Sequence, residues 1–120
     1  MDEPTQPGTP RTLPALDLQR RLEAGEQLLI VDVREDAELA LARLPLAVLH
    51  LPLSRHREWL PELEKLLDRQ QPVVVLCHAG IRSWDFGCWL IQEQGYGDVW
   101  NLQGGIDAWS REVDAQVPRY

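Results

Sequence analysis

The sequence lacks the features that mark secreted, membrane-spanning or nucleic-acid-binding proteins. Two cysteines among 120 residues are too few for a disulfide framework. The formal net charge of −7 disfavours electrostatic binding to nucleic acid or to anionic lipid. No apolar run approaches the roughly 20 residues of a membrane-spanning helix, and the acidic first residues contain no apolar core of a signal peptide. These absences predict a cytoplasmic protein without membrane or nucleic-acid partners.

The remaining composition is that of an ordinary globular domain. Hydrophobic residues make up 44% of the chain and charged residues 26%. A chain of 120 residues can bury a sizeable core without a metal or a disulfide. Residues 1–12 contain three prolines and a glycine among polar residues, so they are predicted to be a flexible N-terminal segment. Residues 13–120 are predicted to form one domain.

Strand-type and helix-type segments alternate along this domain. Buried strands are predicted at residues 28–33, 48–51, 73–76 and 98–102. Helices are predicted at residues 17–23, 35–43, 58–68 and 83–94, and from residue 104 onward. Asp17 is expected to cap the first helix, and Pro61 to fall in the first turn of the third. Because the connections are too long for hairpins, the pattern predicts an α/β fold with a mainly parallel sheet and helices on both faces.

The most informative segment follows the Val73–Leu76 strand. It reads Cys77, His78, Ala79, Gly80, Ile81, Arg82 and Ser83. A cysteine between a strand end and a helix start meets unpaired N–H groups and the positive end of the helix dipole, which favour thiolate over thiol. Gly80 allows successive N–H groups to turn inward, and Arg82 adds a planar fork of donors suited to an oxyanion. Ser83 occupies the expected N-cap position.

Other interpretations of the segment compete with a catalytic one. His78 is a proton carrier, a weak positive neighbour of the thiolate, or a solvent-facing loop residue, and the last is slightly favoured. Cys88 lies in an apolar helix face and is interpreted as core rather than as a resolving thiol. Trp84 either rims a pocket or packs structurally. The cysteines and histidines lack the paired spacing of a zinc site, so no metal or other cofactor is predicted.

Four stretches together resemble the rhodanese family of sulfurtransferases. Cys-x-x-Gly-x-Arg-Ser at residues 77–83 resembles the family's active-site loop, and Asp-Val-Arg-Glu at 32–35 resembles the end of its early strand. Residues 45–54 resemble its Pro-Gly-Ala and Ile-Pro-Leu-Ser stretch, and 101–109 its Asn-Leu-x-Gly-Gly-x-x-x-Trp signature. The resemblance covers the chain from about residue 12 onward. It implies a three-layer, rhodanese-like fold with a central sheet of about five strands.

The resemblance also implies an activity. Cys77 would take the sulfane sulfur of thiosulfate or a similar donor as a persulfide, and pass it to a thiophilic acceptor such as cyanide or a thiol. A protein is a further candidate acceptor. The loop N–H groups and Arg82 would stabilise the persulfide. The Cys-x4-Arg spacing is one residue shorter than the phosphate-sized loop of related phosphatases and arsenate reductases, so such an enzyme is the weaker alternative. The other alternative is a non-catalytic, partner-binding rhodanese module.

Residues around the loop are expected to support it. Asp32 and Arg34 are predicted to be structural neighbours of the site, with Asp32 bracing the loop or Arg34. Residues 42–47 read Ala-Arg-Leu-Pro-Leu-Ala where the family usually has Gly-His-Ile-Pro-Gly-Ala, so the local turn differs. His50 is interpreted as a solvent- or edge-facing residue rather than as a substitute for the missing histidine.

Overall fold

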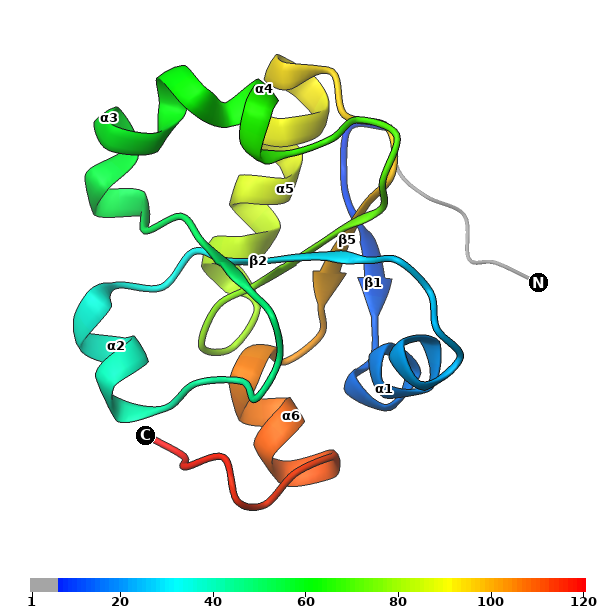
Figure 1. The fold of residues 1–120 in the computed structure, drawn as a ribbon, viewed down its shortest axis with the longest axis vertical. Helices are drawn as coiled ribbons and strands as arrows, with labels where there is room; N and C mark the ends of the chain where they lie inside the picture. Colours follow the sequence, from blue (N-terminus) through cyan, green and yellow to red (C-terminus); the bar gives the residue numbers. More distant parts are fainter. Residues whose placement is uncertain (1–6) are drawn as a thin grey trace.

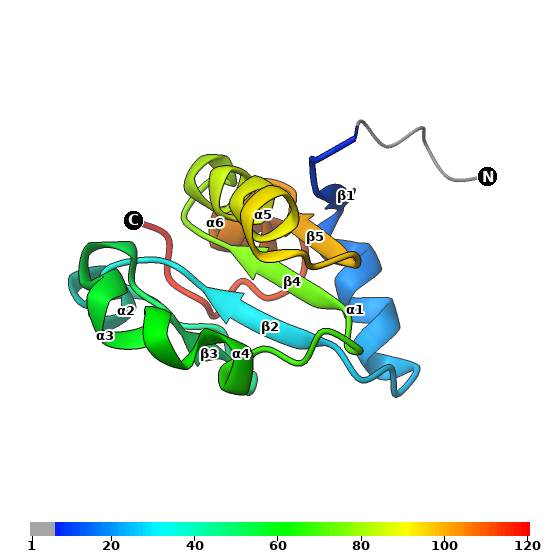
Figure 2. The same ribbon diagram turned by 90° about the horizontal axis from the view of Figure 1, so that it is seen from above.

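Five short parallel strands form the centre of the fold in the computed structural model, which describes residues 7–120. The strands are β1 (Arg11–Leu13), β2 (Leu29–Asp32), β3 (Leu49–His50), β4 (Val73–Leu76) and β5 (Val99–Leu102), in the order β1-β5-β4-β2-β3. Every neighbouring pair is parallel. Figure 2 shows β5, β4 and β2 side by side and pointing the same way. The predicted α/β fold with a parallel sheet is confirmed.

The first strand lies where a flexible segment was predicted. Residues 1–6 of that segment lie outside the described residues, but Arg11–Leu13 pairs with β5, so the prediction is wrong for residues 11 and 12. Three residues between two prolines are too few to show a strand pattern in the sequence. The preceding turn contacts α5, where the side-chain amide of Gln92 donates to the Gly8 carbonyl at 2.9 Å.

Helices connect the strands. The α-helices are α1 (Ala15–Glu23), α2 (Asp36–Leu41), α3 (His56–Trp59), α4 (Leu63–Leu66), α5 (Ile81–Gln94) and α6 (Gly105–Glu112). Two 3₁₀ turns, η1 (Leu53–Arg55) and η2 (Leu60–Glu62), flank α3. The continuous helix predicted at 58–68 is wrong, because Pro61 lies inside it, where proline removes an N–H and disfavours helical geometry at the preceding residue. Asp17 does not cap α1, which begins two residues earlier, after Pro14.

The sheet separates two apolar layers. Val74 and Leu76 of β4 face one layer, whereas Val73, Val75 and the following Cys77 face the other, as the two-residue period of a strand requires. In Figure 1, α1 and α6 lie below the strands, and α3, α4 and α5 lie above them. Cys77 therefore faces the α3–α5 side.

Candidate active site

The Cys77 side chain sits between the end of β4 and the start of α5. It is buried, with 1% of its surface exposed. The loop closes at Gly80, whose φ of +100° belongs to the left-handed region that favours glycine. Gly80 is the N-cap of α5, which begins at Ile81. The helix thus starts two residues before the predicted Ser83, and Ser83 is not its cap.

Two backbone hydrogen-bond donors lie around the Cys77 sulfur. The N–H groups of Gly80 and Ser83 lie 3.1 Å and 3.4 Å from Sγ. The Ser83 hydroxyl oxygen lies 3.3 Å from Sγ, but it donates its single proton to Asn101 Oδ1. Backbone N–H groups at a helix start carry partial positive charge, and they need no rearrangement to meet a negative sulfur. The arrangement can hold either a thiolate or an anionic group bonded to it. Ile81 and Ala79 complete the loop, and the Ile81 side chain is largely exposed.

Asn101 of β5 completes the hydrogen-bond chain behind the sulfur. Its Oδ1 lies 2.5 Å from the buried Ser83 hydroxyl, and its Nδ2 donates to the Gly80 carbonyl at 3.0 Å. Asn101 is therefore tied to both residues that supply donors to Sγ. No role was predicted for it, although the signal was present, since it begins the Asn-Leu-x-Gly-Gly signature.

The start of α6 holds the other side of the loop. The N–H groups of Ile106 and Asp107 donate to the carbonyls of Cys77 and His78, at 2.9 Å and 3.1 Å. Gly105 has a φ of +60°, and a Cβ there would lie 2.4 Å from both carbonyl oxygens. Only glycine permits this approach, which explains the Gly-Gly pair physically.

Arg82 does not point its charge at the cysteine sulfur. Its Nη1 and Nη2 donate to the two carboxylate oxygens of Glu38 on α2, at 2.6 Å and 2.8 Å. This hydrogen bonding raises the pKa of Arg82 above its ordinary value and lowers that of Glu38 from 4.5 to about 2. Both terminal nitrogens of Arg82, which is predicted to stabilise a persulfide on Cys77, are thus bound to Glu38 in this structure. Glu38 gave no sequence signal, because it resembles any exposed helical acid.

Asp32 and Arg34 form a buried ion pair beside the loop. Arg34 has no exposed surface, and its Nη2 donates to the Asp32 carboxylate at 2.8 Å. Burial alone would lower the pKa of Arg34, but hydrogen bonds to Asp32 and Tyr120 outweigh it and raise that pKa. Asp32 thus braces Arg34, one of the two options predicted.

Arg34 also organises the segment that departs from the family pattern. Its Nη2 donates to the Ala42 carbonyl at 2.9 Å and its Nη1 to the Glu38 carbonyl at 3.3 Å, which satisfies the end of α2. Leu44 is buried, and Leu46 packs against the same core. His50 lies on the edge strand as interpreted, with Nε2 at 2.6 Å from the Arg34 carbonyl oxygen.

His78 and Tyr120 form the outer side of the loop. Their rings are stacked, with centroids 4.1 Å apart and planes 14° from parallel. His78 is thus not the free solvent-facing residue that was slightly favoured. The Tyr120 hydroxyl accepts from Arg34 Nη1 at 3.0 Å and donates to Glu38 Oε2 at 2.7 Å. The pKa of Tyr120 is raised to about 12, and burial is the largest cause.

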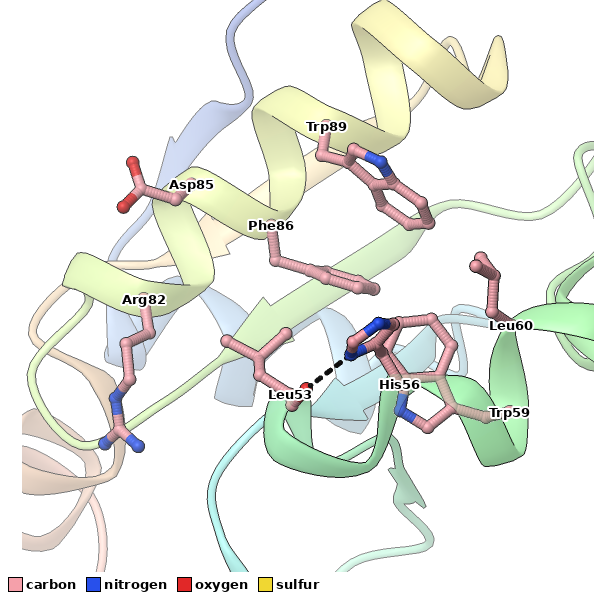
Figure 3. A pocket seen from close by; sticks show the side chains of 8 residues that line it. All are labelled: Leu53, His56, Trp59, Leu60, Arg82, Asp85, Phe86 and Trp89. Carbon is pink, nitrogen blue, oxygen red and sulfur yellow. Dashed lines mark hydrogen bonds between the residues drawn. The ribbon is translucent and has the colours of Figure 1, made fainter.

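An apolar pocket opens on the α3–α5 side (Figure 3), with a volume of about 400 Å³. Its lining consists of Leu53, His56, Trp59, Leu60, Arg82, Asp85, Phe86 and Trp89. Trp59 makes edge-to-face contacts with Phe86 and Trp89. Trp84 is not part of this lining. Cys77 belongs to the same apolar cluster as Trp59 and Phe86, which places the pocket near the loop.

Cys88 lies further along α5 in a different environment. It is half-buried, and desolvation, followed by the charge of Asp85, raises the pKa of its thiol. Within residues 7–120, no three histidine, cysteine or acidic side chains are grouped to hold a metal ion. No helix in this described part has the length and apolar character needed to cross a membrane.

Comparison with known proteins shows what the chain resembles. The model of the rhodanese-like domain matches residues 14–112. "Putative sulfurtransferase YtwF" of Bacillus subtilis is 38% identical over 80% of this chain and 86% of its own length. "Thiosulfate sulfurtransferase GlpE" of Haemophilus influenzae is 32% identical over 75% and 77%. The chain is also 38% identical to a longer Arabidopsis thaliana protein, "Rhodanese-like/PpiC domain-containing protein 12, chloroplastic", but spans only 30% of its length.

A solved structure supports the fold independently. The yeast protein Ygr203w, described as "a homolog of single-domain rhodanese and Cdc25 phosphatase catalytic domain", superposes with a TM-score of 0.72. The match covers 89% of this chain and 85% of the yeast chain at 23% identity. At that identity the likeness concerns the fold alone.

Proposed function

This chain belongs to the rhodanese-like domain family, and from that membership we propose that it transfers sulfane sulfur through Cys77. The donor is thiosulfate or a compound with a similar outer sulfur, and the acceptor is a thiophilic molecule such as cyanide or a thiol. Relatives named sulfurtransferase and thiosulfate sulfurtransferase support this assignment. The observation that carries it is the pair of backbone N–H groups, from Gly80 and Ser83, that point at Cys77 Sγ.

The first step forms the persulfide. The Cys77 thiolate attacks the outer sulfur of thiosulfate, a new S–S bond forms, and the old S–S bond breaks. The electron pair of the broken bond leaves with sulfite. The charges balance, because the thiolate anion and the thiosulfate dianion give the persulfide anion and the sulfite dianion. The N–H groups of Gly80 and Ser83 stabilise the negative sulfur throughout, since they are fixed before the reaction begins.

The second step returns the thiolate. Cyanide attacks the terminal sulfur of the persulfide, which breaks the S–S bond and releases thiocyanate, and the electron pair stays on Cys77. We assign Cys88 no part, because the raised pKa of its thiol lowers the fraction of nucleophilic thiolate.

The apolar pocket is where we place the carbon part of a larger acceptor. Its volume of about 400 Å³ suits a small organic molecule, and its walls are mainly aromatic and aliphatic. Trp89→Ala is expected to raise KM for an apolar thiol several-fold and to leave KM for cyanide unchanged. An equal rise for both acceptors would contradict this placement.

An assay separates the three candidate functions. The protein is incubated with thiosulfate and cyanide, and thiocyanate is measured. Parallel reactions contain a phosphate monoester, or arsenate together with a thiol reductant. Catalytic thiocyanate formation supports the sulfurtransferase. Hydrolysis of the ester or reduction of arsenate without thiocyanate would support the enzyme classes with the longer loop, and inactivity on all substrates would favour a partner-binding module.

A further inference from the structure

Tyr120 lies in the segment after α6, yet its side chain is part of the cysteine loop's surroundings. That segment is fixed to α6 in two places. The Ser110 hydroxyl donates to the Val117 carbonyl at 2.5 Å, and Val117 is buried in the core. Arg119 Nε donates to the carboxylate of Asp107 at 2.9 Å, and the Asp107 N–H itself binds the His78 carbonyl. The segment therefore reaches the loop along a fixed path.

Tyr120 contacts one end of the loop and is linked to the other end through Glu38. Its ring stacks on His78, the residue directly after the nucleophile. Its hydroxyl donates to Glu38, whose carboxylate also accepts both hydrogen bonds from Arg82, the last residue of the Cys-x4-Arg loop. One side chain thus acts on the second loop residue directly and on the final one through a carboxylate.

The residues that supply donors to the sulfur lie close to His78 and Arg82 in the sequence. Gly80 is two residues after His78, and Ser83 directly follows Arg82. A shift at either end of so short a loop moves the N–H groups relative to Sγ, and hydrogen bonds to a developing anion weaken steeply with misplacement. The Tyr120 ring belongs to neither of the two apolar clusters, and its hydroxyl also accepts a hydrogen bond from Arg34.

We propose that Tyr120 is a positioning residue of the sulfur-transfer site, which clamps the Cys77 loop by stacking on His78 and by holding Glu38 against Arg82. The expected effect on the rate of persulfide formation rests on the proposed function. The expected effect on the position of the Cys77 loop does not. Without the clamp, the loop samples arrangements in which Gly80 and Ser83 no longer face the sulfur together. Formation of the persulfide then slows.

Two substitutions separate the ring from the hydroxyl. Tyr120→Leu removes the stack and both hydrogen bonds of the hydroxyl, to Glu38 and from Arg34. It is expected to slow single-turnover persulfide formation about tenfold, because a small misplacement near the reacting atom slows the step. Tyr120→Phe keeps the stack and is expected to recover most of that loss. The chain's other tyrosine supplies the matched control. The Tyr96 hydroxyl donates to the Leu67 carbonyl at the opposite end of the sheet, so Tyr96→Phe and Tyr96→Leu test the effect of lost stability alone.

Two further measurements do not depend on sulfur transfer. The stacked Tyr120 ring shields the His78 ring protons, so their NMR signals should move downfield in Tyr120→Leu and stay in Tyr120→Phe. Alkylation of Cys77 by iodoacetamide at fixed pH should slow in Tyr120→Leu and not in the Tyr96 variants. If Cys77 of the wild-type protein is alkylated by iodoacetamide but forms no persulfide with thiosulfate, the proposed function is wrong. The NMR and alkylation measurements would still test whether Tyr120 positions the loop.

The clamp itself is overturned by any of three results. Tyr120→Leu could react and alkylate like wild type. Tyr120→Phe could be as slow as Tyr120→Leu, which would remove the role of the stack. Tyr96→Leu, at an equal loss of melting temperature, could slow Cys77 as much as Tyr120→Leu does, which would reduce the effect to stability.

Discussion

At its carboxyl end the sheet is packed with buried polar side chains, whereas at its amino end the same strands are joined by open turns. Asp32, Arg34, Ser83 and Asn101 are all buried, and all lie at the carboxyl end around Cys77. At the amino end, Gly25 and Gly95 form turns in which an added Cβ would meet nothing. Buried polar groups are costly unless fully paired, so their concentration at one end marks where positioning matters more than stability.

The largest expected difference between the two ends of the sheet is in sulfur-transfer activity. Cys77→Ser should abolish sulfur transfer, because a serine hydroxyl is a far weaker nucleophile and cannot form a persulfide. Cys88→Ser, half-way along α5 toward the amino end, should leave transfer nearly unchanged. Thiocyanate release from thiosulfate and cyanide measures both. Equal losses in the two variants would indicate a redox pair instead of a single sulfur carrier.

Breaking the buried ion pair should cost the most stability. Asp32→Asn leaves the Arg34 charge buried without its partner, and losses of about 3–5 kcal/mol are typical of such changes. Glu64→Gln removes an exposed partner of Arg69 near the amino end, and is expected to cost less than about 0.5 kcal/mol. Urea unfolding gives both values. Similar losses would show that the carboxyl end is no more sensitive than the surface.

Two glycines with positive φ sharpen the comparison. Gly105→Ala places a Cβ against the Cys77 and His78 carbonyls, and should cost about 3 kcal/mol from strain and overpacking together. Gly95→Ala meets open space and should cost only the strain, about 1–2 kcal/mol. The same unfolding experiment applies. Equal losses would mean that the close approach of α6 to the loop is not tightly packed.

The smallest expected effect is on the stability of the protein at acid pH. The hydrogen bond from Arg82 lowers the pKa of Glu38 from 4.5 to about 2 in the folded protein, so ionised Glu38 stabilises the fold above pH 4.5. That contribution is lost as pH falls from about 4.5 toward 2. Glu38→Gln should therefore show a flatter fall in melting temperature across this window. Parallel curves for the variant and the wild type would contradict it.

The sequence predicted the fold and the loop because their signals are local. Valine-rich β4 and Gly80 can each be interpreted from a few neighbouring residues. Arg82 is predicted to stabilise the persulfide, and the sequence does not show the carboxylate that binds its guanidinium, because Glu38 precedes it by 44 residues. Tyr120 was missed for the same reason, since it meets Arg34 across 86 residues of sequence.

The claim that Cys77 carries the transferred sulfur can be tested by locating that sulfur atom in the protein. Wild-type protein is treated with thiosulfate, digested without reductant, and mapped by mass spectrometry. Sulfur transfer through Cys77 predicts a gain of about 32 Da, one sulfur atom, on the peptide containing Cys77 and none on the peptide containing Cys88. Cyanide should remove the added mass. An unmodified Cys77 peptide, or a gain on Cys88 alone, would contradict the central claim.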